Sequence, residues 1–157
     1  MTKVLFLIPG LSNSGAPKIL TWVANQLSTC GYRASICTLL DFEQKLTTAK
    51  NVHVFPLQVK WEGSIIQRFA IQLPLLRRRL MALLDEEKPD VVVSFGDLFS
   101  CLCLRQISRQ YRVLLSERVD PYQKGIINQL KRQQYGYAHG FVFQTEDARN
   151  YFPPKIQ

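Results

Sequence analysis

The sequence contains few of the residues that build metal sites. It has two histidines and four cysteines among 157 residues, and no two cysteines form a CxxC pair. Zinc sites and the disulfide frameworks of small secreted proteins are usually built from closely spaced ligands or pairs of this kind. We therefore expect no metal site and predict that the thiols are buried and reduced, as is typical of a cytosolic protein. The four are Cys30, Cys37, Cys101 and Cys103.

Long apolar runs are also missing. No run approaches the ~18 residues that a transmembrane helix needs. The first run, residues 4–8, ends at Pro9 and Gly10, which makes it too short for the core of a signal peptide. Basic residues are not interleaved with aromatic ones, so we expect no nucleic-acid partner. These absences predict a cytoplasmic protein.

Apolar residues and positive charge are present in quantity. The chain is 46% hydrophobic, which lets residues 1–157 bury one sizeable core as a single domain. Its formal net charge is +8. Such a balance makes an anionic partner plausible, for example nucleotide phosphates or anionic lipid, although many basic proteins have no such partner.

Buried-strand patterns alternate with helical ones along the whole chain. Strands are predicted at residues 4–8, 33–40, 52–57, 91–95, 111–116 and 140–143. Helices are predicted at residues 17–27, 66–83, 98–108, 124–137 and 146–151, with a kink or a break at Pro74. This alternation predicts βαβ units in a doubly wound, mainly parallel Rossmann-like sheet of α/β class, with three α/β/α layers.

The loop after the first strand contains two glycines, in the stretch KVLFLIPGLSNSGAPK. Gly10 and Gly15 have the spacing of a P-loop, but Ala16 and Pro17 stand where that motif needs Lys and then Ser or Thr. A dinucleotide-binding fingerprint would need three closely spaced glycines. Two interpretations stay open. The loop makes room for a ligand whose anion faces the next helix, or it is an ordinary strand-to-helix turn.

Four segments together resemble the N-terminal domain of family 4 glycosyltransferases, which are retaining enzymes of the GT-B type. They are KVLFLIPGLSNSGAPKIL, KPDVVVSF, LLSERVDP and YGYAHGFVFQTEDARNYFP, and the resemblance covers essentially the whole chain. It implies a nucleotide-sugar donor, most often a UDP-sugar, and a glycan or lipid-linked acceptor. It implies no cofactor and no metal for the chemistry.

The chain departs from the family pattern at several positions. Ser14-Gly15 replaces a doubled glycine, and Pro17 replaces the usual glutamate. Glu117-Arg118 stands where many relatives have a histidine, and His139 stands at a usual aspartate, where we expect a structural role. Family members also have a second Rossmann-like domain with most of the donor contacts. Because the sequence stops after YFPPKIQ, where a linker would begin, we expect this chain to be the acceptor-side half.

Site candidates follow the ends of predicted strands, where α/β proteins bind ligands. Glu117 and Arg118 are the catalytic candidates. Glu117 could act as an acid, as a base or as an acceptor for a sugar hydroxyl. Arg118 could pair with a phosphate or a sugar-acid group. For both residues the alternative is an ion pair within the domain. The candidates for donor or acceptor binding are Gly10, Gly15, Lys18 and Asp97. For Lys18 the alternative is a solvated helix lysine, and for Asp97 it is a helix cap.

Three consecutive arginines, Arg77, Arg78 and Arg79, lie in the long predicted helix. A solvated outer face is one interpretation. The other is a surface for anionic lipid, which would place the protein peripherally at the inner face of the plasma membrane. The sequence as a whole predicts the acceptor-side domain of a glycosyltransferase that builds bacterial surface polysaccharide. The alternative is a non-catalytic Rossmann-like module that binds a nucleotide or a protein.

Overall fold

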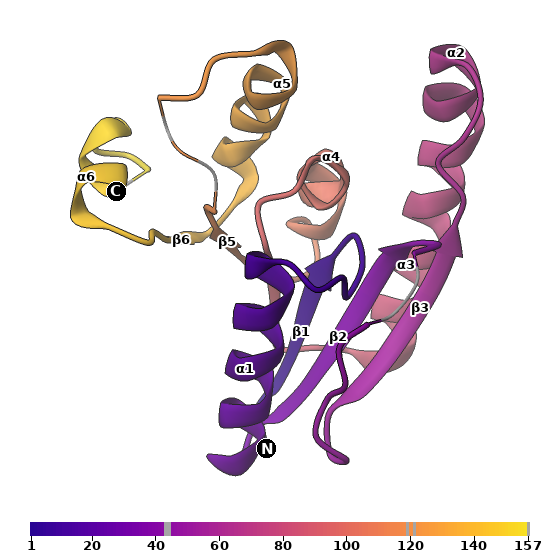
Figure 1. Cartoon of the computed structure of the whole chain (residues 1–157), viewed down its shortest axis with the longest axis vertical. Helices are drawn as coiled ribbons and strands as arrows, with labels where there is room; N and C mark the ends of the chain where they lie inside the picture. Colours follow the sequence, from indigo (N-terminus) through magenta and orange to yellow (C-terminus); the bar gives the residue numbers. More distant parts are fainter. Residues whose placement is uncertain (43–44, 119, 121, 157) are drawn as a thin grey trace.

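A single six-stranded sheet organises the chain. The computed structural model describes residues 1–42, 45–118, 120 and 122–156. All strand pairs are parallel, in the order β3-β2-β1-β4-β5-β6 (Figure 1). The strands are β1 (Lys3–Ile8), β2 (Arg33–Leu40), β3 (His53–Val59), β4 (Val91–Ser94), β5 (Arg112–Ser116) and β6 (Gly140–Val142). The predicted doubly wound parallel sheet is confirmed.

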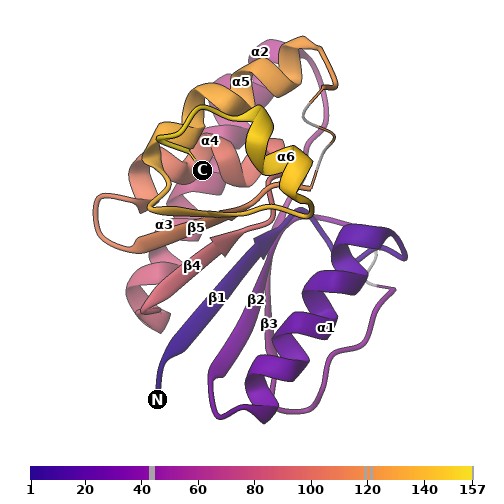
Figure 2. The ribbon, with the colours of Figure 1, turned by 90° about the vertical axis from the view of Figure 1, so that its left-hand side faces the viewer.

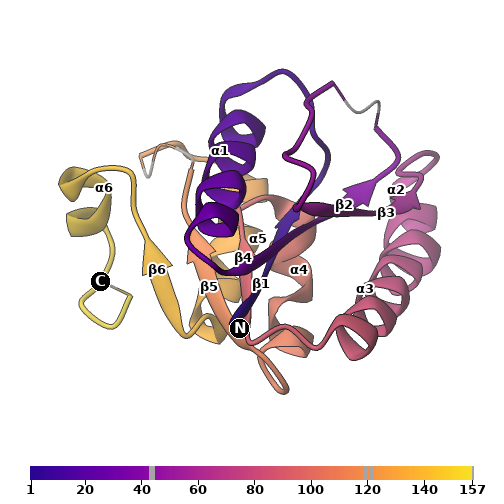
Figure 3. The ribbon, with the colours of Figure 1, turned by 90° about the horizontal axis from the view of Figure 1, so that it is seen from below.

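Helices cover both faces of this sheet. They are α1 (Gly15–Thr29), α2 (Ile65–Gln67), the π-helical η1 (Arg68–Gln72), α3 (Leu73–Glu87), α4 (Leu98–Ile107), α5 (Ile126–Gln134), the 3₁₀-helical η2 (Tyr135–Tyr137) and α6 (Glu146–Tyr151). Figures 2 and 3 show α1 on one face and α3, α4 and α5 on the other. Right-handed crossovers require this, because β2 and β3 lie on one side of β1 and β4 to β6 on the other.

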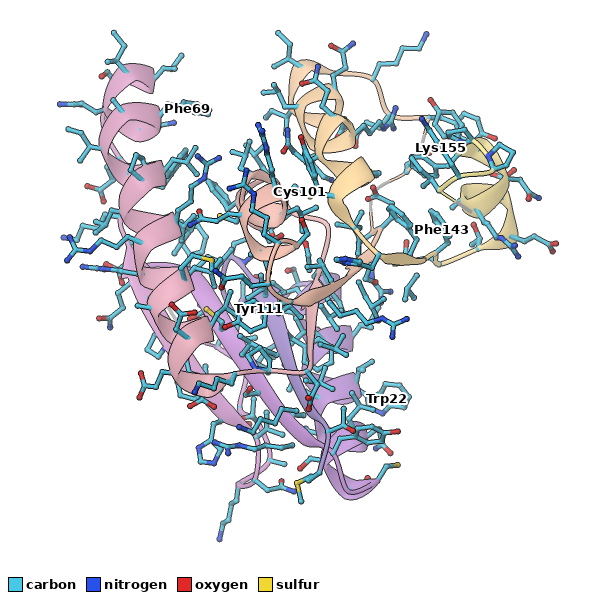
Figure 4. The ribbon with its side chains drawn as sticks, turned by 180° about the vertical axis from the view of Figure 1, so that it is seen from behind. Trp22, Phe69, Cys101, Tyr111, Phe143 and Lys155 are labelled. Atoms are coloured by element: carbon cyan, nitrogen blue, oxygen red, sulfur yellow. The ribbon has the colours of Figure 1, made fainter. Side chains whose placement is uncertain are left out.

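The core consists of two apolar clusters, one on each face of the sheet. Three of the four cysteines, Cys37, Cys101 and Cys103, are buried and free, and burial raises the pKa of each thiol above its usual value. Figure 4 shows Cys101 in the crowded interior. The predicted burial of the thiols is therefore confirmed for these three, but it is wrong for Cys30, which is exposed.

The long helix predicted between residues 66 and 83 is present as one column made of α2, η1 and α3 (Figure 1). Pro74 lies in the first turn of α3, directly after the π-helical segment. Proline has no N–H to donate to the preceding turn, and a wider turn is one way for a helix to accommodate it. The expected irregularity at Pro74 is thus a π-helical turn. Within the described residues, no helix combines the length and apolarity needed to cross a bilayer.

Candidate functional site

A pocket of about 440 Å³ lies where β1 and β4 end. Chain order reverses between these two strands, and ligands of doubly wound folds bind at such a switch point. The pocket is lined by the loop after β1, the start of α4, the end of β5 and one side of α5. The lining residues are Ile8, Pro9, Gly10, Ser12, Ser14, Ala16, Pro17, Phe42, Phe95, Gly96, Asp97, Leu98, Arg118, Gln123, Ile127, Asn128 and Lys131.

The glycine loop forms one wall of this pocket. A Cβ atom at Gly10 would come within 2.9 Å of the Phe42 side chain, so Gly10 lets that aromatic ring pack onto the loop. Gly15 differs, since a Cβ there would meet nothing within 4 Å and its φ is not positive. Gly15 begins α1 beside the pocket residues Ser14 and Ala16. The geometry therefore does not require glycine at position 15 for the turn.

Asp97 follows β4 and caps α4. Its carboxylate accepts hydrogen bonds from the backbone N–H of Phe99 at 2.8 Å and of Ser100 at 2.9 Å. Burial raises the pKa of Asp97, and the hydrogen bonds from Ser100 and Phe99 partly oppose that shift. The predicted capping role is confirmed, and the same carboxyl group also lines the pocket. A contact between Asp97 and an acceptor hydroxyl stays a prediction.

Glu117 and Lys131 form a buried pair at the base of the pocket. Glu117 directly follows β5 and is 5% exposed, while Lys131 comes from α5 and is 4% exposed. The Lys131 Nζ atom lies 3.8 Å from Glu117 Oε1, and the same oxygen accepts a hydrogen bond from the Arg118 backbone N–H at 2.9 Å. Buried charges need this kind of compensation. Lys131 is thus an ion partner of Glu117, and Arg118 reaches the same carboxylate through its backbone N–H.

Arg118 turns its guanidinium onto an aromatic ring. Its Cζ atom lies 4.7 Å from the centroid of Phe95, a cation–π distance. Burial lowers the pKa of Arg118, and its Nε atom has no hydrogen-bond partner in the described chain. Both Arg118 and Phe95 line the pocket. A half-buried arginine with unused donors is available to an anionic ligand.

Several other candidates lie outside the pocket. Lys18 is exposed on α1. His139 accepts a hydrogen bond from the Val113 N–H through Nδ1 at 3.1 Å, which confirms its structural role. Arg77 donates to the Leu102 carbonyl at 2.8 Å, and Arg79 donates to the Leu57 carbonyl at 2.6 Å. Arg78 and Arg79 are both exposed, as a solvated outer face predicts, whereas Arg77 is only partly exposed and turns toward α4.

Sequence reasoning missed two pocket residues. Lys131 lies in a polar segment of α5, where a lysine is normally expected to be solvated, and its burial depends on the end of β5 fourteen positions earlier. Phe42 follows β2, outside any motif, and reaches the pocket by packing on Gly10. A close aromatic neighbour for a loop glycine has no signal in the sequence.

No protein-family model matches this sequence, and no curated protein matches it. Solved structures do match its fold. Sucrose-phosphate synthase from Thermosynechococcus elongatus superposes with a TM-score of 0.73 at 10% identity, over 96% of this chain and 44% of that chain. For UDP-N-acetylglucosamine 2-epimerase from Rickettsia bellii the TM-score is 0.67 at 17% identity, over 99% and 43% of the two chains. For UGT2 from Phytolacca americana, complexed with UDP-2-fluoro-glucose and pterostilbene, it is 0.63 at 13% identity, over 92% and 48%.

These similarities show the fold. The neighbours are glycosyltransferases and UDP-N-acetylglucosamine 2-epimerases of the GT-B type, and the chain has their Rossmann-like architecture. It spans less than half the length of each of the three structures. Membership of family 4 and a retaining mechanism stay predictions from the sequence.

Proposed function

We propose that this chain is the acceptor-side domain of a glycosyltransferase that takes sugar from a nucleotide-sugar donor, with retention of configuration. The observation that carries the proposal is the pocket at the β1/β4 switch point, where the glycine loop faces two cationic side chains. Three solved structures with the same fold support it: a sucrose-phosphate synthase, a UDP-N-acetylglucosamine 2-epimerase, and UGT2 in complex with UDP-2-fluoro-glucose.

Within this proposal, each pocket residue has a role that follows from its chemistry. Arg118 offers unused donors to phosphate or a sugar acid, and Asp97 offers a carboxyl oxygen to an acceptor hydroxyl. Glu117 is the less accessible candidate, because its carboxylate lies beneath the surface and already faces Lys131. We propose a glycan or lipid-linked acceptor from bacterial surface polysaccharide synthesis, as the family resemblance implies.

The purified 157-residue chain is expected to bind ligand without transferring sugar, because a second Rossmann-like domain would hold most of the donor. UDP release from a panel of UDP-sugars measures this, with the chain alone and with a co-expressed polypeptide that supplies such a domain. Release that needs both polypeptides supports the proposal. Sugar transfer by the chain alone would refute the proposal that a second domain is needed to hold the donor. Nucleotide binding without turnover in either sample would favour the non-catalytic binding module.

We further propose that the protein rests on an anionic membrane surface through the free end of its long helix. The stretch from residue 63 to residue 84 contains four arginines and no acidic residue. Three isoleucines near the helix start are strongly exposed: Ile65 (73%), Ile66 (78%) and Ile71 (63%). This apolar tip, Ile65, Ile66 and Ile71, lies where the helix extends past the ends of the strands (Figure 1). Phe69, which Figure 4 labels, packs edge-to-face against Trp61, with the two ring centroids 6.0 Å apart.

The apolar tip is expected to matter more for membrane binding than the arginines do. Arg78→Gln should weaken binding about fivefold, since a near-surface cation contributes ~1 kcal/mol. The double substitution Ile65→Asn, Ile66→Asn should weaken it about tenfold or more through lost apolar burial. Co-sedimentation with phosphatidylglycerol vesicles at two salt concentrations measures both effects. Trp22→Ser, which removes an exposed apolar side chain from α1, is the control. Unchanged binding by the double variant would eliminate the apolar tip as a membrane contact.

A further inference from the structure

Two cationic side chains, Arg118 and Lys131, converge on the pocket opposite the loop 9–14. Arg118 comes from the end of β5, and Lys131 comes from α5, which follows in the chain. Both line the same 440 Å³ pocket as Gly10, Ser12 and Ser14. Cations from two elements and a glycine loop therefore border one cavity.

Lys131 keeps donor capacity that the protein does not use. An ammonium has three N–H donors, and hydrogen bonds to oxygen are normally 2.7–3.2 Å long. The 3.8 Å separation from Glu117 Oε1 is a charge contact longer than that range. Nζ donates no hydrogen bond to any described residue, although Lys131 is only 4% exposed. A buried cation in this position is suited to a ligand oxygen that enters from the pocket.

Arg118 has a similar unmet capacity. Its guanidinium lies over the Phe95 ring, its Nε atom has no partner, and it pairs with no carboxylate in the described chain. The ring fixes the guanidinium beside the pocket without using any of its N–H groups. A planar fork of donors held this way matches the oxygens of a phosphoryl group.

The acidic groups around the pocket are largely compensated. Glu117 faces Lys131, and Asp97 accepts hydrogen bonds from the first turn of α4. On the opposite wall α1 begins at Gly15 with no acidic residue in its first turn, and the Ser14 side chain leaves the amides of that turn uncapped. Arg118 and the start of α1 are thus left without a negative partner in the described structure.

We propose that Arg118 and Lys131 form a phosphoryl-binding subsite that faces the loop 9–14. The subsite deepens the proposed function and rests on it for the identity of the ligand: the phosphoryl group belongs to the nucleotide-sugar donor or to a phosphorylated acceptor. Glu117 then has a positioning role, because it holds the Lys131 ammonium and limits the positive charge that the pocket presents.

The test is calorimetric titration of the 157-residue chain with inorganic pyrophosphate. Arg118→Gln should weaken binding about tenfold, as expected for loss of a charge-assisted hydrogen bond. Glu117→Gln should tighten binding, because Lys131 loses its competing anion. Adding Lys131→Met to Glu117→Gln should reverse that gain and weaken binding about tenfold relative to Glu117→Gln. Arg112→Gln, at the other end of β5, removes the same charge far from the pocket and is the control.

The subsite is supported if Glu117→Gln binds pyrophosphate more tightly than wild type does and the added Lys131→Met weakens that binding. It would be overturned if wild type failed to bind pyrophosphate at millimolar concentration, if Glu117→Gln weakened binding, or if Arg112→Gln weakened it as much as Arg118→Gln. Competition between pyrophosphate and UDP assigns the subsite to the donor, and simultaneous binding of UDP and a sugar phosphate assigns it to the acceptor. If none of these substitutions changes the affinity for a UDP-sugar, the subsite is refuted and the proposed function still stands. Pyrophosphate binding without any preference for nucleotides refutes the nucleotide-sugar proposal and leaves the subsite standing.

Discussion

Gly96→Ala is expected to lower the melting temperature by about 5–10 °C. Gly96 has φ +65°, and a Cβ atom there would lie 2.7 Å from the Ser116 carbonyl oxygen. The left-handed conformation costs an L-residue roughly 1–2 kcal/mol, and relieving the overlap moves β4 and β5 apart at a similar cost. In a domain of this size, 1 kcal/mol corresponds to about 2–4 °C.

The control for this prediction is Gly136→Ala. A Cβ atom at Gly136 would meet nothing within 4 Å, and its φ is not positive, so its melting temperature should stay near that of wild type. Thermal unfolding followed by circular dichroism measures both variants. If Gly96→Ala and Gly136→Ala had equal melting temperatures, the backbone around residue 96 would accept a side chain with no loss of stability. That result would contradict the close packing of Gly96 on the end of β5.

The arrangement of the sheet could be predicted because its signals are local. The apolar runs at residues 4–8 and 91–95, the second interrupted only by Ser94, are typical of strands covered on both faces, and β1 and β4 are indeed neighbours in the centre. Boundaries were less predictable where backbone geometry departs from the ordinary. Gly125 has φ +149°, so α5 begins at Ile126 rather than Lys124, and β3 continues to Val59 through Gln58 with φ +51°.

The candidate site could be predicted only in part. Strand ends identified Asp97 and Arg118, because topology alone brings them to one edge of the sheet. The pairing of Glu117 with Lys131 depends on how α5 packs against the end of β5, and no local pattern encodes that contact. The arginine triplet was predicted in part: Arg78 and Arg79 are exposed, as a solvated face requires, whereas Arg77 is partly buried and donates to the Leu102 carbonyl of α4.

Lys131→Met is expected to destabilise the domain by about 3 kcal/mol, near the lower end of the range for breaking a buried ion pair. The reason is that Glu117, 5% exposed, would lose the cation that compensates its charge. The 3.8 Å separation is long for such a pair, which keeps the expected cost at that lower end. Urea unfolding of wild type and variant gives the difference in free energy.

Glu117→Gln in the Lys131→Met background should recover most of this loss, because the amide carries no charge to leave uncompensated. The double-mutant cycle therefore predicts a coupling free energy of roughly 2 kcal/mol between the two positions. Lys124→Met, at an exposed position before α5, should leave stability nearly unchanged. If the single and double variants unfold at the same urea concentration, then Glu117 does not depend on Lys131, and the base of the pocket is held together by the packing of α5 against α4 instead.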